Sequence, residues 1–515
     1  MTTSVAIAAP SEAAADAGEQ VARAGGNAVD AAVAAVLVTM VNEVGLVSLS
    51  SGGFVTVQPG DGSAPVTVDG WMDMPGREAP DLGGAPDGAF GGAPHGAFGG
   101  GTWDVDTTYG GGVTITVGPG SVAAHGSVAA LGEAHARWGV LPWAELVQPA
   151  IDVARSGFRL SAASRYYLEY VHESIFGWDP TSRSIVHDDG GEITTEAVVV
   201  PDLAATLEII AAHGPRAMHE GDLARAISAD VLARGGLLGA ADLAAYQPVV
   251  RPSLASRLGE WTFGTNPPPA VGGVCVAAML ALLDGHPRAP LTDLRWSDAD
   301  VDHMVRVQRA VLAARLDRLE GAADLAAEAA VLLGQIDAGG IAALESGSTA
   351  HVSATDSAGL ACAVTVSSGY SSGMVAAGTG VWLNNCLGEQ ELNPRGLHGL
   401  PPGTRLLSNM APTVGRHTDG TTLAIGSPGA DRITTAVVQA IAGLVNGGLG
   451  LQAAVNHPRV HVHRAGRPNE EVKVETEPSM YFGGVAATLR RPDGHLVAAA
   501  DPRRDGAVRL VHLHP

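Results

Sequence analysis

Cysteine is scarce in this chain of 515 residues, which has only Cys275, Cys362 and Cys386. An odd number of widely separated cysteines does not make a disulfide framework, and no Cys-x-x-Cys pair offers a zinc site. We therefore expect three buried thiols. His457 and His461 have a metal-ligand spacing, but a proline and a strand-like run interrupt it, so we interpret it as chance. No motif in the sequence requires a cofactor.

Basic runs and long apolar runs are also missing. The chain has 53 acidic and 31 basic residues and a formal net charge of −22, which repels nucleic acid and anionic membranes. The first 20 residues lack a basic region followed by an apolar run, and no stretch of about 20 apolar residues follows later. We expect a soluble, cytoplasmic protein that binds neither nucleic acid nor a membrane. A hydrophobic fraction of 46% is enough for a large core.

The spacing of apolar residues changes along the chain. Residues 11–40 predict two helices separated by Gly25 and Gly26, with Asn27 as the cap of the second. Residues 122–238 and 298–320 are also typical of helices. From residue 349 onward, alternating patterns predict strands at 349–366, 423–425 and 459–463. A helical half followed by a strand-rich half indicates an α+β layered fold.

Residues 81–112 are rich in glycine and proline and contain the near repeat GGAPDGAF, GGAPHGAF. This composition predicts a surface loop. A lid that covers the substrate is the alternative.

Seven short motifs occur in a fixed order along the chain. They are GGNAVDAAVAA at residues 25–35, SSGGF at 50–54, GPGSV at 118–122, NPPP at 266–269, GSTAHVSA at 347–354, LNN at 383–385 and GSPGADR at 426–432. With these motifs the chain resembles the γ-glutamyltranspeptidase family nearly end to end. The resemblance implies a four-layer αββα sandwich of two antiparallel sheets flanked by helices, the fold of N-terminal-nucleophile (Ntn) hydrolases.

The resemblance also implies that the chain cuts itself between Ser348 and Thr349. The fragments 1–348 and 349–515 would stay together as one folding unit, a heterodimer of the chain's own pieces. Cleavage frees the α-amine of Thr349, whose reference pKa is about 7.7–8.0. That amine can accept the hydroxyl proton, so one residue supplies both nucleophile and base.

Other residues near Thr349 match supporting positions of the family. Ser367 stands where the family has a second hydroxyl that steadies the terminal amine, and Thr365 is a nearby alternative. His351 shares a strand face with Thr349, but we interpret it as a structural histidine rather than a base.

The turn at residues 426–430 matches the family's oxyanion loop. Here the backbone N–H groups of Gly429 and Ala430 would face the carbonyl oxygen of the substrate. Asn384 and Asn385 are expected mainly to hold this region together, with a possible substrate contact from Asn385.

The chain departs from the family where the glutamyl group would bind. Trp71 stands in place of the arginine that clamps the substrate's α-carboxylate, and Arg77 could replace that arginine only if the loop shifts. Ser408 and Asn409 occupy the positions of the serine pair that binds the same carboxylate in the family. Of the acidic pair that binds the α-amine there, only Glu389 is present. Losing such a charge-assisted contact costs roughly 2–5 kcal/mol.

We therefore expect a hydrolase whose small-molecule substrate is not a glutamyl compound. Trp71 would offer a flat apolar wall to a ring or an acyl chain. Two branches of the family with other substrates match this expectation. One contains amide-cleaving acylases like those acting on cephalosporins. The other contains enzymes of 4-alkylproline antibiotic pathways, which hydrolyse a carbon–carbon bond next to a ketone. Genuine γ-glutamyl transfer and a non-catalytic binding protein are the alternatives.

Overall fold

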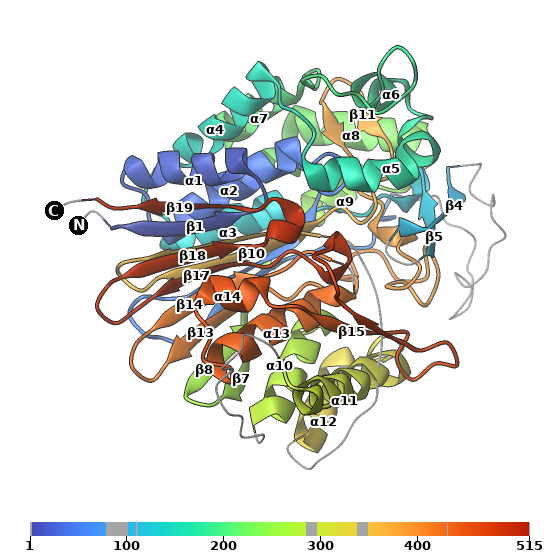
Figure 1. Cartoon of the computed structure of the whole chain (residues 1–515). Coiled ribbons are helices and arrows are strands. Elements are labelled where there is room, and N and C mark those ends of the chain that lie inside the picture. Colours follow the sequence, from blue (N-terminus) through green and yellow to red (C-terminus); the bar gives the residue numbers. More distant parts are fainter. Residues whose placement is uncertain are drawn as a thin grey trace.

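Two antiparallel sheets lie face to face at the centre of the computed structural model, which describes residues 3–78, 101–109, 112–284, 296–336, 349–429 and 431–513 (Figure 1). Within these residues, the first sheet has seven strands in the order β19-β1-β9-β10-β2-β3-β6 and the second has six in the order β18-β17-β14-β13-β8-β7. The first sheet consists of β19 (Ala507–Val511), β1 (Val5–Ala9), β9 (Ala350–Asp356), β10 (Ala361–Ser367), β2 (Gly52–Gln58), β3 (Val66–Gly70) and β6 (Val249–Pro252). The second consists of β18 (Leu496–Ala500), β17 (Ala486–Arg490), β14 (Thr422–Gly426), β13 (Thr413–His417), β8 (Trp261–Thr265) and β7 (Leu254–Leu258).

Helices cover the outer face of each sheet, which confirms the expected αββα order. The first helical layer contains α1 (Glu12–Arg23), α2 (Ala28–Asn42), α3 (Ser127–Trp138), α4 (Trp143–Ser156), α5 (Ala162–Phe176), α6 (Pro180–Val186), α7 (Leu203–His213), α8 (Gly221–Ala233) and α9 (Ala240–Ala245). The second contains α10 (Val271–Asp284), α11 (Asp298–Ala314), α12 (Leu325–Ile336), α13 (Arg432–Val445) and α14 (Leu451–Asn456). Among the described residues, none of the helices combines the length and the apolar character needed to cross a bilayer.

The sequence signals at the first two helices are confirmed. Gly25 lies between α1 and α2 with a φ of 101°, a backbone conformation that favours glycine. The side chain of Asn27 accepts hydrogen bonds from the N–H groups of Val29 and Asp30, and the carboxylate of Asp30 accepts one from the N–H of Asn27. This capping box starts α2, the helix that packs across β1, β9 and β10.

Part of the predicted loop at residues 81–112 is a strand instead. Residues 103–107 form β4 (Trp103–Thr107), which pairs with β5 (Val113–Val117). Their alternation of apolar and polar residues, Trp-Asp-Val-Asp-Thr, suits a half-buried strand better than a loop. The repeat at residues 83–98 lies outside the described residues, so the predicted lid is not tested.

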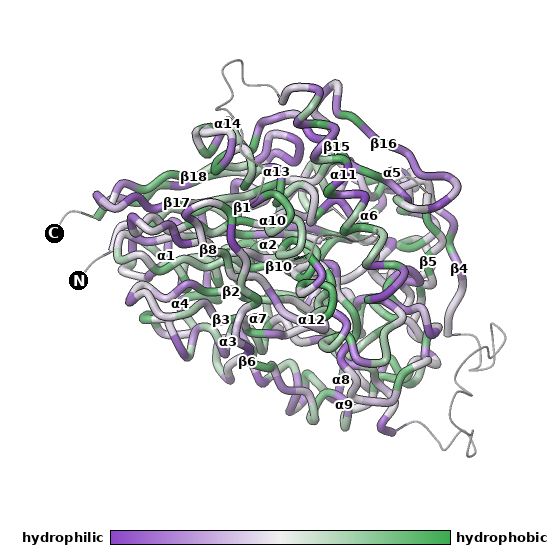
Figure 2. Tube along the Cα trace, turned by 90° about the horizontal axis from the view of Figure 1, so that it is seen from below, coloured by the Kyte–Doolittle hydropathy of each residue, from purple (hydrophilic) through white to green (hydrophobic). Residues whose placement is uncertain are grey.

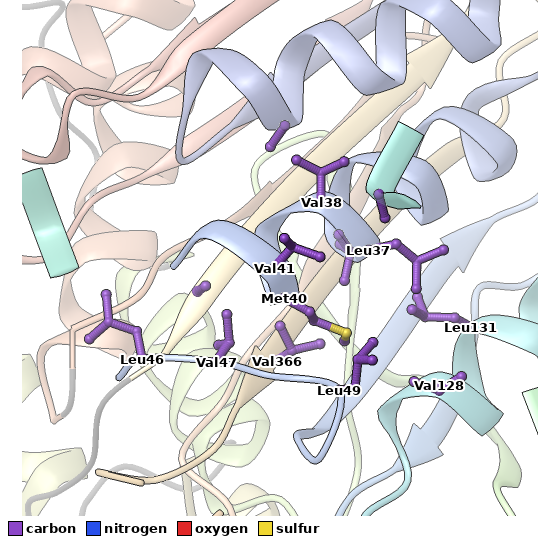
Figure 3. Close-up of a cluster of buried hydrophobic side chains, with 14 of the residues drawn as sticks. Leu37, Val38, Met40, Val41, Leu46, Val47, Leu49, Val128, Leu131 and Val366 are labelled. Carbon is purple, nitrogen blue, oxygen red and sulfur yellow. The ribbon is translucent and has the colours of Figure 1, made fainter. Parts of the chain in front are cut away.

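The core on the first sheet is built from aliphatic side chains of α2, α3 and β10. Figure 3 shows Val366 of β10 among Leu37, Val41 and their neighbours, with Leu131 of α3 closing the far side. The hydrophobic stretches of α2 and α10 lie at the centre of the chain trace in Figure 2. All three cysteines are buried, as expected.

The layer between the two sheets is made of small and hydroxyl side chains. Ala361 and Ala363 of the first sheet pack against Val414 and Ala424 of the second. At the neighbouring strands, the hydroxyl of Thr355 lies 2.7 Å from that of Thr488. Small side chains let the sheets approach closely, and the hydroxyls pair across the gap, so polar groups can be buried here without loss.

Removing the cap of α2 tests how the first helical layer is anchored. Asn27→Ala deletes the acceptor for two N–H groups and the 2.5 Å bond from the Asn27 amide to the carbonyl of Trp138. We expect the free energy of unfolding to fall by about 1–2 kcal/mol. Asn27→Ser keeps a cap acceptor without placing a charge beside the carbonyl of Trp138 and the carboxylate of Asp30, so it should lose less. Thermal unfolding of both variants measures this, and equal losses would contradict the capping role.

Candidate active site

Thr349 lies at the buried start of β9, between the two sheets. It is 2% exposed, and side chains alternate along the strand, so it shares a face with His351 and Ser353. That face meets the second sheet, because the hydroxyl of Ser353 donates to the carbonyl of Ala486 over 3.1 Å. The opposite face, with Val352, packs in the core under α2. The nucleophile predicted from sequence therefore points into the layer between the sheets.

Ser367 is placed opposite Thr349 by the register of the two central strands. Ala350 pairs with Val366 in the antiparallel ladder, so the next position brings Thr349 beside Ser367. The Ser367 hydroxyl accepts a hydrogen bond from the N–H of Gly369 over 3.0 Å. Thr365, the alternative from sequence, is bound to His351 instead, 2.7 Å from its Nδ1.

His351 is enclosed and fully hydrogen-bonded. Its Nδ1 contacts the Thr365 hydroxyl, and its Nε2 lies 2.9 Å from the Ser353 hydroxyl. Burial lowers the pKa of His351 to about 3, so the ring is neutral at physiological pH. Gly426 is required beneath it, because a Cβ there would lie 2.3 Å from Cε1 of the ring. These contacts support the structural role expected for His351.

The glycine turn after β14 leads directly into α13. Gly429 has a φ of 127°, and a Cβ at this position would lie 2.8 Å from Cα of Gly483. The turn therefore needs glycine at position 429. It is followed by the N-terminal end of α13, where the helix dipole favours negative charge. Ala430, the second expected donor, and Ser348 lie outside the described residues.

Asn384 and Asn385 tie together several loops that are distant in sequence. Asn384 is fully buried; its amide oxygen accepts from the N–H of Ala123, and its amide nitrogen donates to the carbonyls of Ser50 and Ala123. Asn385 accepts from the N–H of Tyr370 and donates to the carbonyl of Thr116. Both amides are occupied by protein partners, as a structural role requires.

Trp71 is packed beside the segment that carries Ser408 and Asn409. It is 2% exposed, stacks on Phe54 with ring centroids 6.3 Å apart, and donates from its indole N–H to the carbonyl of Leu407 over 2.7 Å. Ser408 is 1% exposed, and Asn409 is 3% exposed. The structure thus brings together the positions where the family would hold the α-carboxylate, and it fills the arginine's place with an indole.

Arg77 lies apart from this group. Its side chain is 43% exposed, and its Nε is 3.9 Å from Asp242. The cation near Trp71 is Arg405, which donates to Asp69 and to the carbonyl of Trp71 and forms an ion pair with Asp73. Because these partners occupy Arg405, it does not replace the missing clamp.

Glu389 is buried beside a second carboxylate that sequence reasoning missed, Glu391. Burial and the charge of Glu391 raise the pKa of Glu389 well above its usual value, and burial also raises that of Glu391. The hydroxyl of Tyr370 donates to Glu391 over 3.1 Å. Two carboxylates this close favour sharing a proton or binding a cation. The spacing Glu-x-Glu in the sequence was the only available signal.

Asp431 follows the glycine turn and lies against the guanidinium of Arg432 and the imidazoles of His461 and His463. Burial would raise its pKa, but Arg432 and His461 hold it well below the usual value. Asp431, His461 and His463 place three potential metal-ligand atoms within 4.8 Å of one another, as do His172, Glu173 and His187. His461 thus contacts Asp431 at 3.0 Å, whereas His457 belongs to neither group.

Comparison with known proteins agrees with this arrangement. The sequence model of the family described as Gamma-glutamyltranspeptidase matches residues 14–511. The chain belongs to the γ-glutamyltranspeptidase family. It is accordingly an enzyme of hydrolase or transferase type, with the Ntn-hydrolase fold.

Curated relatives of the chain include acylases and glutathione hydrolases. "Acylase ACY 1 proenzyme" of Pseudomonas sp. (strain V22) is 30% identical, over 95% of this chain and 90% of its own length. "Glutathione hydrolase proenzyme" of Escherichia coli (strain K12) is 28% identical, over 94% and 88%.

Solved structures share the fold over nearly the whole chain. Cephalosporin acylase from Bacillus halodurans has a TM-score of 0.77 at 21% identity, covering 99% of this chain and 96% of its own. The structure of LmbA2991HD has a TM-score of 0.76 at 22% identity, covering 99% and 98%.

The neutral state of His351 predicts a pH dependence of stability. The unfolded histidine titrates near pH 6.5 and the folded one near pH 3, so only the unfolded state binds the proton in between. The contribution of His351 to the free energy of unfolding is complete above about pH 6.5. Below that pH it falls by about 1.4 kcal/mol per pH unit. His351→Gln should therefore lose less stability than the wild type between pH 6.5 and pH 4.5.

Unfolding measured across this pH range tests the prediction. His213→Gln, at an exposed histidine, is the matched control and should keep the wild-type slope. Identical slopes for wild type and His351→Gln would show that His351 is not held neutral.

Proposed function

We propose that this enzyme cuts its own chain before Thr349 and uses the new N-terminal threonine to attack the carbonyl of a small molecule. The observation that carries the proposal is the position of Thr349, buried opposite Ser367 and two residues before His351, whose ring lies against Gly426 of the glycine turn. The fragments 1–348 and 349–515 would remain joined, because β9 and β10 are central strands between β1 and β2.

The geometry supports a short sequence of steps. The freed α-amine takes the proton of the Thr349 hydroxyl, and the oxygen adds to the carbonyl carbon. The developing negative charge faces the backbone of Gly429 at the start of α13, where an oxyanion-hole donor contributes about 3–4 kcal/mol. Collapse breaks the bond between the carbonyl carbon and the leaving group, which takes the proton held by the α-amine, and leaves an ester on Thr349. Water then hydrolyses that ester and frees the acid and the threonine hydroxyl.

We infer that the acyl part of the substrate is not glutamyl. Trp71 occupies the clamp position, Arg405 is bound by Asp69 and Asp73, and Arg77 lies exposed beside Asp242. An apolar ring or acyl chain suits the wall formed by Trp71 and its neighbours, where an unpaired α-carboxylate would be costly.

Two reactions remain open for such a substrate. Amide hydrolysis is supported by the relative named as an acylase. Hydrolysis of a carbon–carbon bond next to a ketone, as in 4-alkylproline antibiotic pathways, uses the same attack and the same oxyanion turn. Genuine γ-glutamyl transfer is the second candidate, favoured by buried Glu389 and the glutathione hydrolase relatives. A non-catalytic binding protein is the third.

Substitution of the nucleophile tests the self-cleavage. Thr349→Ala should run as one band of about 52 kDa on a denaturing gel, and the wild type as two. Thr349→Ser keeps a hydroxyl and should still cleave, more slowly. Loss of turnover in Thr349→Ala should be at least about a thousandfold. A wild-type chain that stays uncut while hydrolysing substrate would contradict the proposal.

A γ-glutamyl anilide tests the substrate class. Without the clamp, its kcat/KM should be lower than that of an apolar acyl anilide by about 30-fold or more. Trp71→Phe keeps the apolar wall and should preserve this order of substrates. A preference for the γ-glutamyl anilide would establish genuine glutamyl transfer instead.

A further inference from the structure

Two histidines of one strand and an aspartate at the start of a helix gather three metal-binding atoms away from Thr349 in sequence. The strand is β15 (Val460–His463), which pairs with β16 (Glu471–Val474) and packs against α11 and α13 (Figure 1). Side chains alternate along a strand, so His461 and His463 project from one face, while Val462 projects from the other into the core of the second sheet. Asp431, the residue before α13, contacts both imidazoles.

The distances between these atoms fit the ligand spacing of a small divalent cation. Oδ2 of Asp431 lies 3.0 Å from Nε2 of His461 and 3.6 Å from Nδ1 of His463, and the three ligand atoms lie within 4.8 Å of one another. In a tetrahedral zinc site with bonds of about 2.0–2.1 Å, the ligand atoms are about 3.3 Å apart. The two measured distances lie on either side of this value, so small side-chain rotations close the set around an ion.

The backbone of β15 is fixed by two buried glutamines along the edge that faces away from β16. Gln308 of α11 donates to the carbonyl of Val460 over 3.0 Å and accepts from the N–H of Val462 over 3.1 Å. Gln439 of α13 donates to the same carbonyl and accepts from the N–H of Val460, both over 2.9 Å. The strand therefore presents its two imidazoles from a rigid position, as a preorganised site requires.

The ring of His461 is oriented by a neighbouring hydroxyl. The Thr435 hydroxyl donates to the carbonyl of Arg432 over 3.1 Å, so it accepts from the Nδ1–H of His461 over 3.2 Å. Nε2 of His461 then carries a lone pair and faces Oδ2 of Asp431, which also has only lone pairs to offer. A cation between these two atoms removes their repulsion. A ring nitrogen fixed by a partner in this way is typical of a metal-binding histidine.

The carboxylate of Asp431 serves two neighbours with its two oxygens. Oδ1 contacts the guanidinium of Arg432, which also donates to the carbonyl of Tyr481 over 2.9 Å, and Oδ2 faces the histidines. The positive charge of Arg432 repels a bound cation and lowers its affinity below that of a closed site with several anionic ligands. We therefore expect an ion that can be removed and added back. The side chain of His463 is 13% exposed and provides the access from solvent.

A second group of possible ligands, His172, Glu173 and His187, is less well built. Glu173 lies on the surface, and both of its oxygens accept from Arg183. Nδ1 of His172 lies 3.0 Å from Nε2 of His187, an ordinary hydrogen-bond distance between two imidazoles. This group lacks a buried carboxylate, and it provides a matched control.

We propose that Asp431, His461 and His463 form a binding site for a divalent transition-metal ion, with zinc as the ion that fits best. Two imidazole nitrogens and one carboxylate oxygen suit zinc and its neighbours, whereas calcium and magnesium prefer oxygen ligands alone. Three protein ligands leave a further position for water. The ion would tie β15 to the start of α13, the helix that follows the glycine turn. This goes beyond the function proposed above, and the steps at Thr349 do not pass through the ion.

Calorimetric titration of untagged, metal-stripped enzyme with zinc chloride tests the site. Zinc should bind the wild type and raise its Tm as the zinc concentration increases. His463→Gln removes the ligand nearest to solvent and should weaken binding by about a hundredfold or more. Thr435→Val keeps all three ligands but removes the partner of His461, and it should weaken binding by about tenfold or more.

His172→Gln is the matched control at the surface group and should keep both the zinc affinity and the rise in Tm. Wild-type protein that binds no zinc, equal affinity in the wild type and His463→Gln, or loss of binding in His172→Gln would overturn the proposal.

Cobalt loading of the wild type tests the same site without any substitution. Cobalt held by imidazole and carboxylate gives weak visible bands, whereas cobalt held by a thiolate adds an intense charge-transfer band. The proposal predicts the weak bands alone, and their loss when zinc is added. An intense thiolate band would place the ion at one of the buried cysteines and contradict the proposal.

Discussion

The pairing of β9 with β10 is the constraint on which the rest of the site depends. It sets Thr349 opposite Ser367 and turns the Thr349 side chain toward the second sheet. A slip by one residue would turn Thr349 into the aliphatic core under α2. Two hydrogen bonds oppose such a slip. One joins the side chains of His351 and Thr365, and the other runs from the Ser353 hydroxyl to the carbonyl of Ala486 in the second sheet. The polar layer between the sheets therefore fixes the register that places Thr349 opposite Ser367.

The same layer explains the glycines near the site. Gly426 makes room for the His351 ring, and Gly429 and Gly483 bring two backbones into contact. At Trp71 the chain is apolar, because the indole packs in one cluster with Met72, Met74 and Met410.

Sequence patterns predicted the helices and strands well where the chemistry is local. Asn27 caps α2 because its side chain reaches N–H groups two and three residues ahead, a relation visible in sequence. The family motifs likewise pointed to Thr349, Ser367 and Gly429. Glu391 was missed, because its significance depends on its burial beside Glu389, which the spacing Glu-x-Glu alone does not reveal. Arg77 shows the opposite error. Its position six residues after Trp71 made it a candidate to bind the substrate carboxylate, but its side chain lies beside Asp242. The roles of the site residues remain predictions.

The central claim is that Thr349 becomes an N-terminal nucleophile, and covalent trapping tests it most directly. Purified enzyme would be incubated with a β-lactone, an electrophilic carbonyl probe, and analysed by intact-mass and peptide mass spectrometry. The account predicts one lactone adduct on a fragment that begins at Thr349, mapped to the threonine itself. An adduct on another residue, or on an uncut chain of 52.1 kDa, would contradict it.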